Sequence, residues 1–155
     1  MTSVFLLRDD RLLLLFRRGS RAIADSWVGV GGHVEPAELA DPTRAALREL
    51  DEEIGVASDQ LADLSLRYVA LRDSGSEVRT TYYFTARLAS DVVVPERCEE
   101  GDLRWFRLDA VPTDLDMPPT ATAVLRHWLE HGRHDDALRL VTMTADQLAA
   151  QVTGQ

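Results

Sequence analysis

Lysine is missing from this chain: all 17 of its basic residues are arginine. Chemistry that depends on a lysine amine, such as Schiff-base formation or the phosphate grip of a P-loop, is therefore excluded. Cysteine is nearly absent as well. Because Cys98 stands alone, no intrachain disulfide can form, which fits a reducing cytoplasm.

Long apolar runs are also absent. The run Leu12–Phe16 is far shorter than the roughly 18 apolar residues of a membrane span, and arginines flank it. Residues 1–5 carry no basic region of the kind that opens a signal peptide. We therefore expect a cytoplasmic protein with no membrane partner.

Positive charge is scarce, since 26 acidic residues outnumber the 17 arginines and leave a net charge of −9. Nucleic-acid polymers normally bind a basic face, so we expect no such partner. A small phosphorylated substrate remains compatible with this charge, because a bound metal ion reverses the local sign.

The chain is long enough to bury a core, with 155 residues of which 45% are hydrophobic. We predict one domain over residues 1–155, in which 136–155 form a weakly amphipathic tail without a definite predicted structure. Apolar periodicity and turn residues predict strands over 3–8, 12–17, 27–30, 64–71, 78–88, 92–94 and 103–108.

Two helices complete the predicted architecture. The first begins at Asp41-Pro42, an N-cap followed by proline, and ends at Gly55. The second covers residues 121–131 and places Val124, Leu125, Trp128 and Leu129 on its buried face. Strands and helices in this order predict an α+β fold with a mixed sheet between helices.

The first helix carries an unusual set of acidic residues. Glu49, Glu52 and Glu53 are spaced i, i+3 and i+4, so their side chains leave the helix on one face. Three carboxylates held so close repel one another, and a hard divalent cation such as Mg²⁺ or Mn²⁺ would offset that repulsion. A cation site next to the Gly31-Gly32 turn indicates chemistry on phosphates.

These residues resemble the Nudix hydrolase signature. Its second half, Arg-Glu-apolar-any-Glu-Glu-any-Gly-apolar, matches in full over Arg48–Val56, and its first half matches as Gly32 and Glu38. The spacer Leu39–Leu47 is two residues longer than the pattern. These extra residues fall in a surface loop, which absorbs an insertion at small cost.

The resemblance implies a Nudix-type α/β/α sandwich that hydrolyses a nucleoside diphosphate linked to another moiety, with Mg²⁺ or Mn²⁺. Glu52 and Glu53 look like metal ligands, Glu49 looks like a ligand or the general base, and the Gly31 carbonyl commonly supplies another ligand. Arg48 is counted among the catalytic residues, because its ion pair with Glu38 looks like a support that fixes the loop against the helix. A solvated acidic helix face is the alternative for this cluster.

Within the family, the region from Arg17-Arg18 to Gly32 is similar to MutT-like 8-oxo-dGTP diphosphatases. Glu100, or else Glu99, corresponds to a further metal-binding glutamate, with an exposed acidic loop as the alternative. The aspartate pair of human-type oxidised-purine hydrolases has no match, because Asp114 and Asp116 are displaced.

The resemblance implies a nucleoside triphosphate of the 8-oxo-dGTP type as substrate, with ADP-ribose or another sugar-linked diphosphate as the alternative. A non-catalytic nucleotide-sensing domain is the alternative from a different class. We expect a small-molecule nucleotide partner and a monomer or homodimer. The candidate substrate contacts are Arg17, Arg18, Trp27 and Gly32.

Other positions nearby stay open. Arg21 lies beside the same loop as Arg17 and Arg18, and surface arginines at a strand end are the alternative for all three. Trp27 or Phe84 could stack on a base, with core packing as the alternative.

Overall fold

The structure is a computed structural model that describes residues 1–19, 24–147 and 149–153. Arg21 lies outside the described residues. The longer elements are β1 (Thr2–Arg8), β2 (Arg11–Arg17), α1 (Pro42–Ile54), β4 (Leu61–Asp73), β5 (Val78–Leu88), β7 (Gly101–Arg107), α2 (Pro119–Glu130) and β8 (Arg139–Met143). The shorter ones are β3 (Ser26–Val28), η1 (Pro36–Glu38), η2 (Ser58–Gln60), β6 (Arg97–Cys98), η3 (Gly132–His134) and β9 (Gln151–Thr153).

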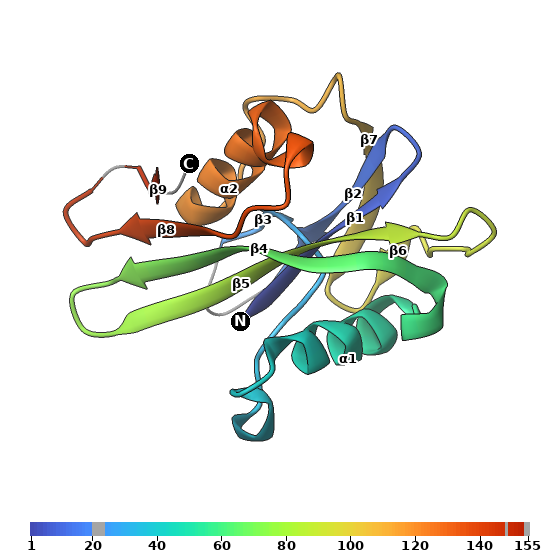
Figure 1. Cartoon of the computed structure of the whole chain (residues 1–155), viewed down its shortest axis with the longest axis horizontal. Coiled ribbons are helices and arrows are strands. Elements are labelled where there is room, and N and C mark those ends of the chain that lie inside the picture. Colours follow the sequence, from blue (N-terminus) through green and yellow to red (C-terminus); the bar gives the residue numbers. More distant parts are fainter. Residues whose placement is uncertain (20–23, 148, 154–155) are drawn as a thin grey trace.

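Within the described residues, nine strands form one sheet in the order β6-β7-β2-β1-β5-β4-β8-β9, with β3 paired to β2 (Figure 1). The pairs β1–β5 and β4–β8 are parallel and the others are antiparallel. The sheet is therefore mixed, as the sequence predicts. Among the described residues, no helix combines the length and hydrophobicity needed to cross a bilayer.

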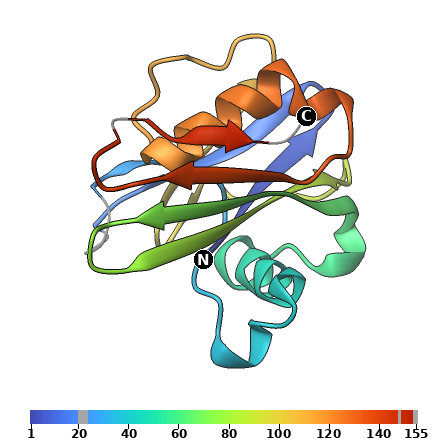
Figure 2. The ribbon, with the colours of Figure 1, turned by 60° about the vertical axis from the view of Figure 1, so that its left-hand side comes forward.

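The sheet is buried on both faces because successive side chains of its central strands alternate between two cores. In β1, Val4 and Leu6 belong to the core cluster that includes α1. Phe5 and Leu7 belong to the cluster that includes α2. The two helices lie on opposite sides of the sheet (Figure 2), which confirms the α/β/α sandwich.

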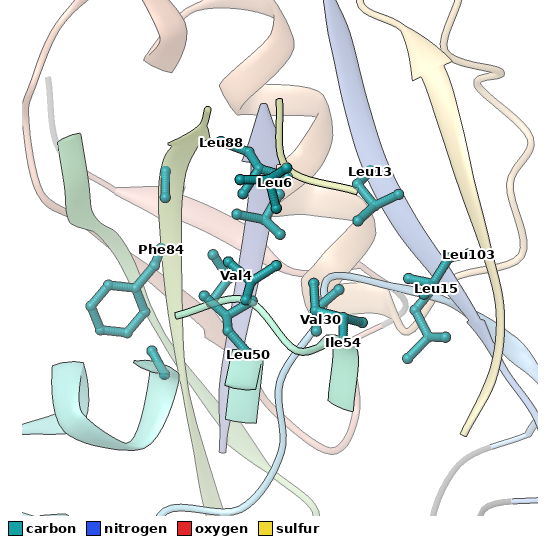
Figure 3. Close-up of a cluster of buried hydrophobic side chains, with 14 residues drawn as sticks. Val4, Leu6, Leu13, Leu15, Val30, Leu50, Ile54, Phe84, Leu88 and Leu103 are labelled. Carbon is teal, nitrogen blue, oxygen red and sulfur yellow. The ribbon is translucent and has the colours of Figure 1, made fainter. Parts of the chain in front are cut away.

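The core beneath α1 positions that helix against the sheet. Its closely packed members include Val4, Leu15, Val30, Leu50 and Ile54 (Figure 3). Each of these side chains is at most 5% exposed. Because a close-packed interior tolerates little displacement, the opposite, acidic edge of α1 is held in a fixed place relative to β1.

The ends of α1 are the ones that the sequence predicts. Asp41 is the N-cap, and its side chain accepts a hydrogen bond from the backbone N–H of Thr43 at 3.2 Å. Gly55 ends the helix with φ of 68°, in the left-handed region, and its N–H bonds to the carbonyls of Asp51 and Leu50. These caps fix which residues of the acidic run are helical.

The prediction of a strand over residues 92–94 is wrong. That segment is irregular: Val92 packs into the core beneath α1, whereas Val93 is 88% exposed. A three-residue run followed by Pro95, which has no N–H for a sheet ladder, is a weak strand signal. The short strand lies a few residues later, in β6.

The tail that the sequence left without a predicted structure extends the sheet. Strand β8 pairs in parallel with β4, and β9 returns antiparallel to β8. Arg139 anchors this segment through two hydrogen bonds to the Asp135 carboxylate, at 2.6 and 2.9 Å. That a single domain covers residues 1–155 stays a prediction.

The Asp41 cap supplies a test of the fold. Replacing Asp41 by Ala should lower the free energy of unfolding by about 1 kcal/mol, because one N-terminal N–H of α1 loses its partner. Denaturant unfolding measures this change. Asp51→Ala is the control, because Asp51 is exposed in the last turn of the same helix, away from the N-cap. An equal loss of unfolding free energy in the two variants would contradict the role of Asp41 as a stabilising N-cap.

Candidate active site

A glycine loop between β3 and η1 is pinned to the first strand. The N–H of Thr2 donates to the carbonyl of Gly32 at 2.8 Å, and Val4 and Val30 exchange two backbone hydrogen bonds. Gly31 has φ of 148°, and a Cβ there would lie 2.6 Å from the Thr2 carbonyl oxygen. The approach of the two backbones therefore requires a residue without a side chain.

Arg48 joins the loop to the acidic edge of α1. Its Nε and Nη2 each donate to one carboxylate oxygen of Glu38 at 3.0 Å, and Nη2 also bonds the His33 carbonyl at 2.8 Å. Its Nη1 donates to Glu49 and Glu52, both at 2.9 Å. The planar guanidinium thus orients three carboxylates and one loop carbonyl together.

Glu38 reaches Arg48 despite the longer spacer. Its helical turn, η1, is followed by a turn at Leu39-Ala40 that takes up the extra length on the surface. The Arg48 guanidinium, together with the backbone N–H of Glu35, lowers the pKa of the Glu38 carboxyl to about 2. Glu38 is therefore an anion throughout the neutral range.

Glu53 points from α1 toward the glycine loop, where its Oε2 accepts a hydrogen bond from the N–H of Gly31 at 3.2 Å. Burial raises the pKa of its carboxyl to about 8, and contact with Glu100 and the charge of Glu49 act in the same direction. Glu100 Oε2 is buried with no hydrogen-bond partner among the described residues. Two carboxyl groups packed together in this way require a shared proton or a cation.

Glu100 is brought to this place by the sheet. It precedes Gly101, which pairs with Arg17 across β2 and β7. Arg17 Nη2 contacts Glu100 Oε1 at 2.5 Å, and the N–H of Arg18 donates to the Glu100 carbonyl at 2.9 Å. Glu99, the second candidate, is exposed, so the structure brings Glu100 rather than Glu99 beside Glu53.

The donor set fits a hard divalent cation, because carboxylate and carbonyl oxygens are the ligands that Mg²⁺ and Mn²⁺ prefer. In the described part of the chain, no three His, Cys, Asp or Glu side chains are already grouped as a metal cage. Arg48 pairs with Glu49 and Glu52, and Arg17 pairs with one oxygen of Glu100. The partnerless Glu100 oxygen and the crowded Glu53 are where a cation would relieve the repulsion.

A cleft of about 750 Å³ opens on the α2 side of the sheet, and none of these carboxylates lines it. Of the predicted site residues, Arg17 and Gly31 line it, as does the exposed His33. Its floor includes Ser3 of β1 and Tyr83 of β5, which are partners in the β1–β5 register. The cleft is large enough for a small-molecule ligand.

Three of the four predicted substrate contacts, Arg18, Trp27 and Gly32, do not line this cleft. Trp27 packs against Phe16 and Phe106, with ring centroids 5.1 Å apart in both pairs. Arg18 is paired with Asp102 at 2.5 Å. Core packing is thus the better account of Trp27, and a surface ion pair is the better account of Arg18. The same holds for Phe84, which is 1% exposed in the core beneath α1.

Gly32 also lies away from the cleft lining. A Cβ at Gly32 would sit 2.5 Å from Glu49 Oε2, so this glycine makes room for the carboxylate of Glu49. Its part in the site is therefore to let the loop approach α1.

Several cleft residues were not among the predicted contacts. Arg72 of β4, Arg79 and Tyr83 of β5, and Asp116 before α2 all line the cleft. The alternation along β5 signals that Arg79, Thr81 and Tyr83 share a face. Only the pairing of β5 with β1 shows that this face meets the glycine loop.

The fold and the acidic site define the class of this protein. The model of the NUDIX domain family matches residues 2–131, and the chain belongs to that family. In this structure the signature residues form a glycine loop, a carboxylate-bearing helix and the Arg48 hub, by which we mean Arg48 with its hydrogen bonds to three glutamates and the His33 carbonyl. All of them lie within an α/β/α sandwich.

The chain is similar to several characterised proteins. It is 31% identical over 138 residues to the NAD-capped RNA hydrolase NudC of Deinococcus radiodurans, covering 89% of this chain and 43% of that one. It thus spans about two fifths of the length of the curated relatives it matches.

Solved structures share the fold. A MutT protein from Bacillus halodurans superposes with a TM-score of 0.72 at 22% identity, covering 99% of this chain and 97% of that one. The NUDIX domain of Shewanella oneidensis NrtR, complexed with ADP-ribose, gives a TM-score of 0.63 at 16% identity, with 86% of each chain covered.

The Arg48 hub supplies a test of this geometry. Arg48→Ala should lower the free energy of unfolding by about 1–3 kcal/mol, because several carboxylate and carbonyl oxygens lose their donor. Thermal or denaturant unfolding measures the change. Arg44→Ala is the matched control, one turn earlier on α1 and exposed. The hub would be refuted by an Arg48→Ala protein as stable as the Arg44→Ala protein.

Proposed function

We propose that this protein is a pyrophosphohydrolase that uses Mg²⁺ or Mn²⁺ to cleave nucleoside diphosphate derivatives. One observation carries the proposal: Glu53 and Glu100 pack together, and the residues that contact them, Gly31 and Arg17, line a cleft. A crowded carboxylate pair next to a ligand-sized cleft supports metal-assisted chemistry on phosphates.

Three segments of the chain supply the residues that would hold the metal. Glu52 and Glu53 come from α1, Glu100 from the β6–β7 turn, and the carbonyl of Gly31 from the loop. Bound there, the ion would neutralise charge on the phosphate oxygens and lower the pKa of a bound water. In the reaction, water attacks a phosphorus and the bridging P–O bond breaks, so that two phosphorylated products leave.

The protein residues around this centre have separate tasks. Glu49 is nine-tenths buried and fixed by Arg48, so it is suited to act as a ligand or to accept the proton of the attacking water. Arg48 and Glu38 are positioning residues, because they hold the loop carbonyls and α1 at a constant separation. Arg17 is suited to grip a phosphate once Glu100 turns to the cation.

Among substrates, we propose a nucleoside triphosphate of the 8-oxo-dGTP type first. The likeness of the loop region to MutT-like enzymes supports this choice. Asp116 is exposed at the cleft wall, where a carboxylate can accept a hydrogen bond from a base amino group. A small-molecule nucleotide remains the proposed partner of a monomer or homodimer located in the cytoplasm.

A dinucleotide of the NAD type is the second candidate, because curated relatives matching most of this chain are named NAD-capped RNA hydrolases. ADP-ribose is related to it in chemistry and is the ligand of the NrtR domain. The prediction that no nucleic-acid polymer binds stays a prediction, supported by the net charge of −9.

A substrate panel separates these candidates. We expect 8-oxo-dGTP to be hydrolysed with Mg²⁺ or Mn²⁺ at a higher kcat/KM than dGTP, ADP-ribose, NAD or dinucleoside polyphosphates, with pyrophosphate released. Chromatography of the products identifies the bond that is cut. A higher kcat/KM for NAD or an NAD-capped oligonucleotide would replace the first candidate by the second. Tight nucleotide binding without turnover would favour the sensing domain.

Glu53→Gln tests the catalytic centre. Turnover of the best panel substrate should fall by about 10²–10⁴-fold, because an amide neither balances cation charge nor accepts a proton. Stabilisation of the folded protein by Mg²⁺, followed as a shift in melting temperature, should disappear together with activity. Asp51→Asn removes a neighbouring exposed charge of α1 and should leave both readouts unchanged. Wild-type turnover by Glu53→Gln would place the site elsewhere.

A further inference from the structure

Two arginines face each other at the rim of the cleft that is farthest along β5 from the glycine loop. Arg72 of β4 and Arg79 of β5 are direct partners in the antiparallel register. Both line the cleft. They sit on the β4–β5 hairpin, which extends the sheet beyond β1 on the left of Figure 1.

This pairing is unfavourable by itself. Side chains directly opposite on antiparallel strands have Cβ atoms about 4.5–5.5 Å apart, and like charges at that distance are destabilising. Arg79 is bonded to Glu77, with Nη2 at 2.5 Å from Oε1. Arg72 is exposed and forms no ion pair within the described residues. In a protein with a net charge of −9, general basicity does not account for such a pair.

The position of the pair relative to the metal-binding end is fixed by strand geometry. Arg79, Thr81 and Tyr83 alternate along one face of β5, so Arg79 lies about 13 Å along the strand from Tyr83. Tyr83 is the register partner of Ser3. Ser3 in turn lies against the glycine loop, because a Cβ added to Gly29 would be only 2.6 Å from the Ser3 Oγ. The arginines thus lie at the end of the cleft away from Gly31, the glycine whose N–H donates to Glu53.

We propose that Arg72 and Arg79 bind a phosphate on the substrate's ribose, at its 2′ or 3′ position, beyond the diphosphate that is cleaved. The inference rests on the proposed function, which puts the diphosphate next to the carboxylates. The nucleoside would then lie over Ser3 and Tyr83, between the glycine loop and the arginines. Guanidinium groups bind phosphate oxygens through paired, charge-assisted hydrogen bonds. A phosphate dianion bound between the two arginines would attract both of them and so offset their mutual repulsion. The substrate would then be a nucleoside diphosphate derivative that carries a further phosphate on its ribose.

Equilibrium binding tests the subsite without requiring turnover. Adenosine and guanosine 5′-monophosphates are titrated by calorimetry beside their 2′,5′- and 3′,5′-bisphosphates. For one of the bisphosphates, the added phosphate should tighten binding by at least about 10-fold in the wild type, as charge-assisted hydrogen bonds do. Arg72→Gln and Arg79→Gln should each remove most of that preference. Glu77→Gln, which frees Arg79, should increase it.

Arg87→Gln is the matched control, because Arg87 is an exposed arginine of the same strand and does not line the cleft. It should retain the wild-type preference, and melting curves verify that each variant is folded. Equal binding of mono- and bisphosphates by the wild type would overturn the proposal. So would a preference that survives in both Arg72→Gln and Arg79→Gln.

The result is separable from the proposed hydrolysis. A wild-type preference lost in the arginine variants, together with no turnover of any panel substrate, would establish the phosphate subsite and refute the hydrolase. Metal-dependent turnover without any bisphosphate preference would support the hydrolase and refute the phosphate subsite. The hydrolase and the subsite are both supported if matched substrates with and without the ribose phosphate differ in kcat/KM and that difference disappears in Arg72→Gln.

Discussion

The constraint on which this structure depends is the crowding of negative charge where α1, the glycine loop and the β6–β7 turn meet. The carboxylates gathered there are those of Glu38, Glu49, Glu52, Glu53 and Glu100. Arg48 offsets part of this charge at one side and Arg17 at the other. The remaining charge lies on buried or half-buried groups, where repulsion is screened less than at the surface, so a cation is the natural complement.

The rest of the fold can be understood as the frame that keeps these groups together. The core beneath α1 holds the helix, and backbone hydrogen bonds between β1 and the glycine loop hold the loop. The β2–β7 register carries Glu100 to the same place from a segment about 50 residues later in the chain. Gly31 and Arg17, which contact carboxylates of this acidic centre, also line the cleft on the other face of the sheet.

Local signals in the sequence were enough for most of the fold. Alternation in β1 and β2 reflects two buried faces, and Asp41 and Gly55 delimit α1 because capping is a property of a few adjacent residues. The predictions failed or stopped where pairing is non-local. Residues 92–94 have strand-forming side chains but pair with no strand in the part of the chain that the structure describes, whereas Arg139–Met143 form a strand because the edge of β4 is available to them.

The sequence by itself determined the acidic edge of α1, its link through Arg48 to Glu38 and the glycine turn, since spacing along a helix and a tight turn are local properties. Only the tertiary structure decided that Glu100 rather than Glu99 joins Glu53. It also decided that Trp27 belongs to an aromatic cluster, and that Arg72 lies directly opposite Arg79 on neighbouring strands at one rim of the cleft. These outcomes depend on strand register and on the order of strands in the sheet, which arise from contacts between residues far apart in the chain.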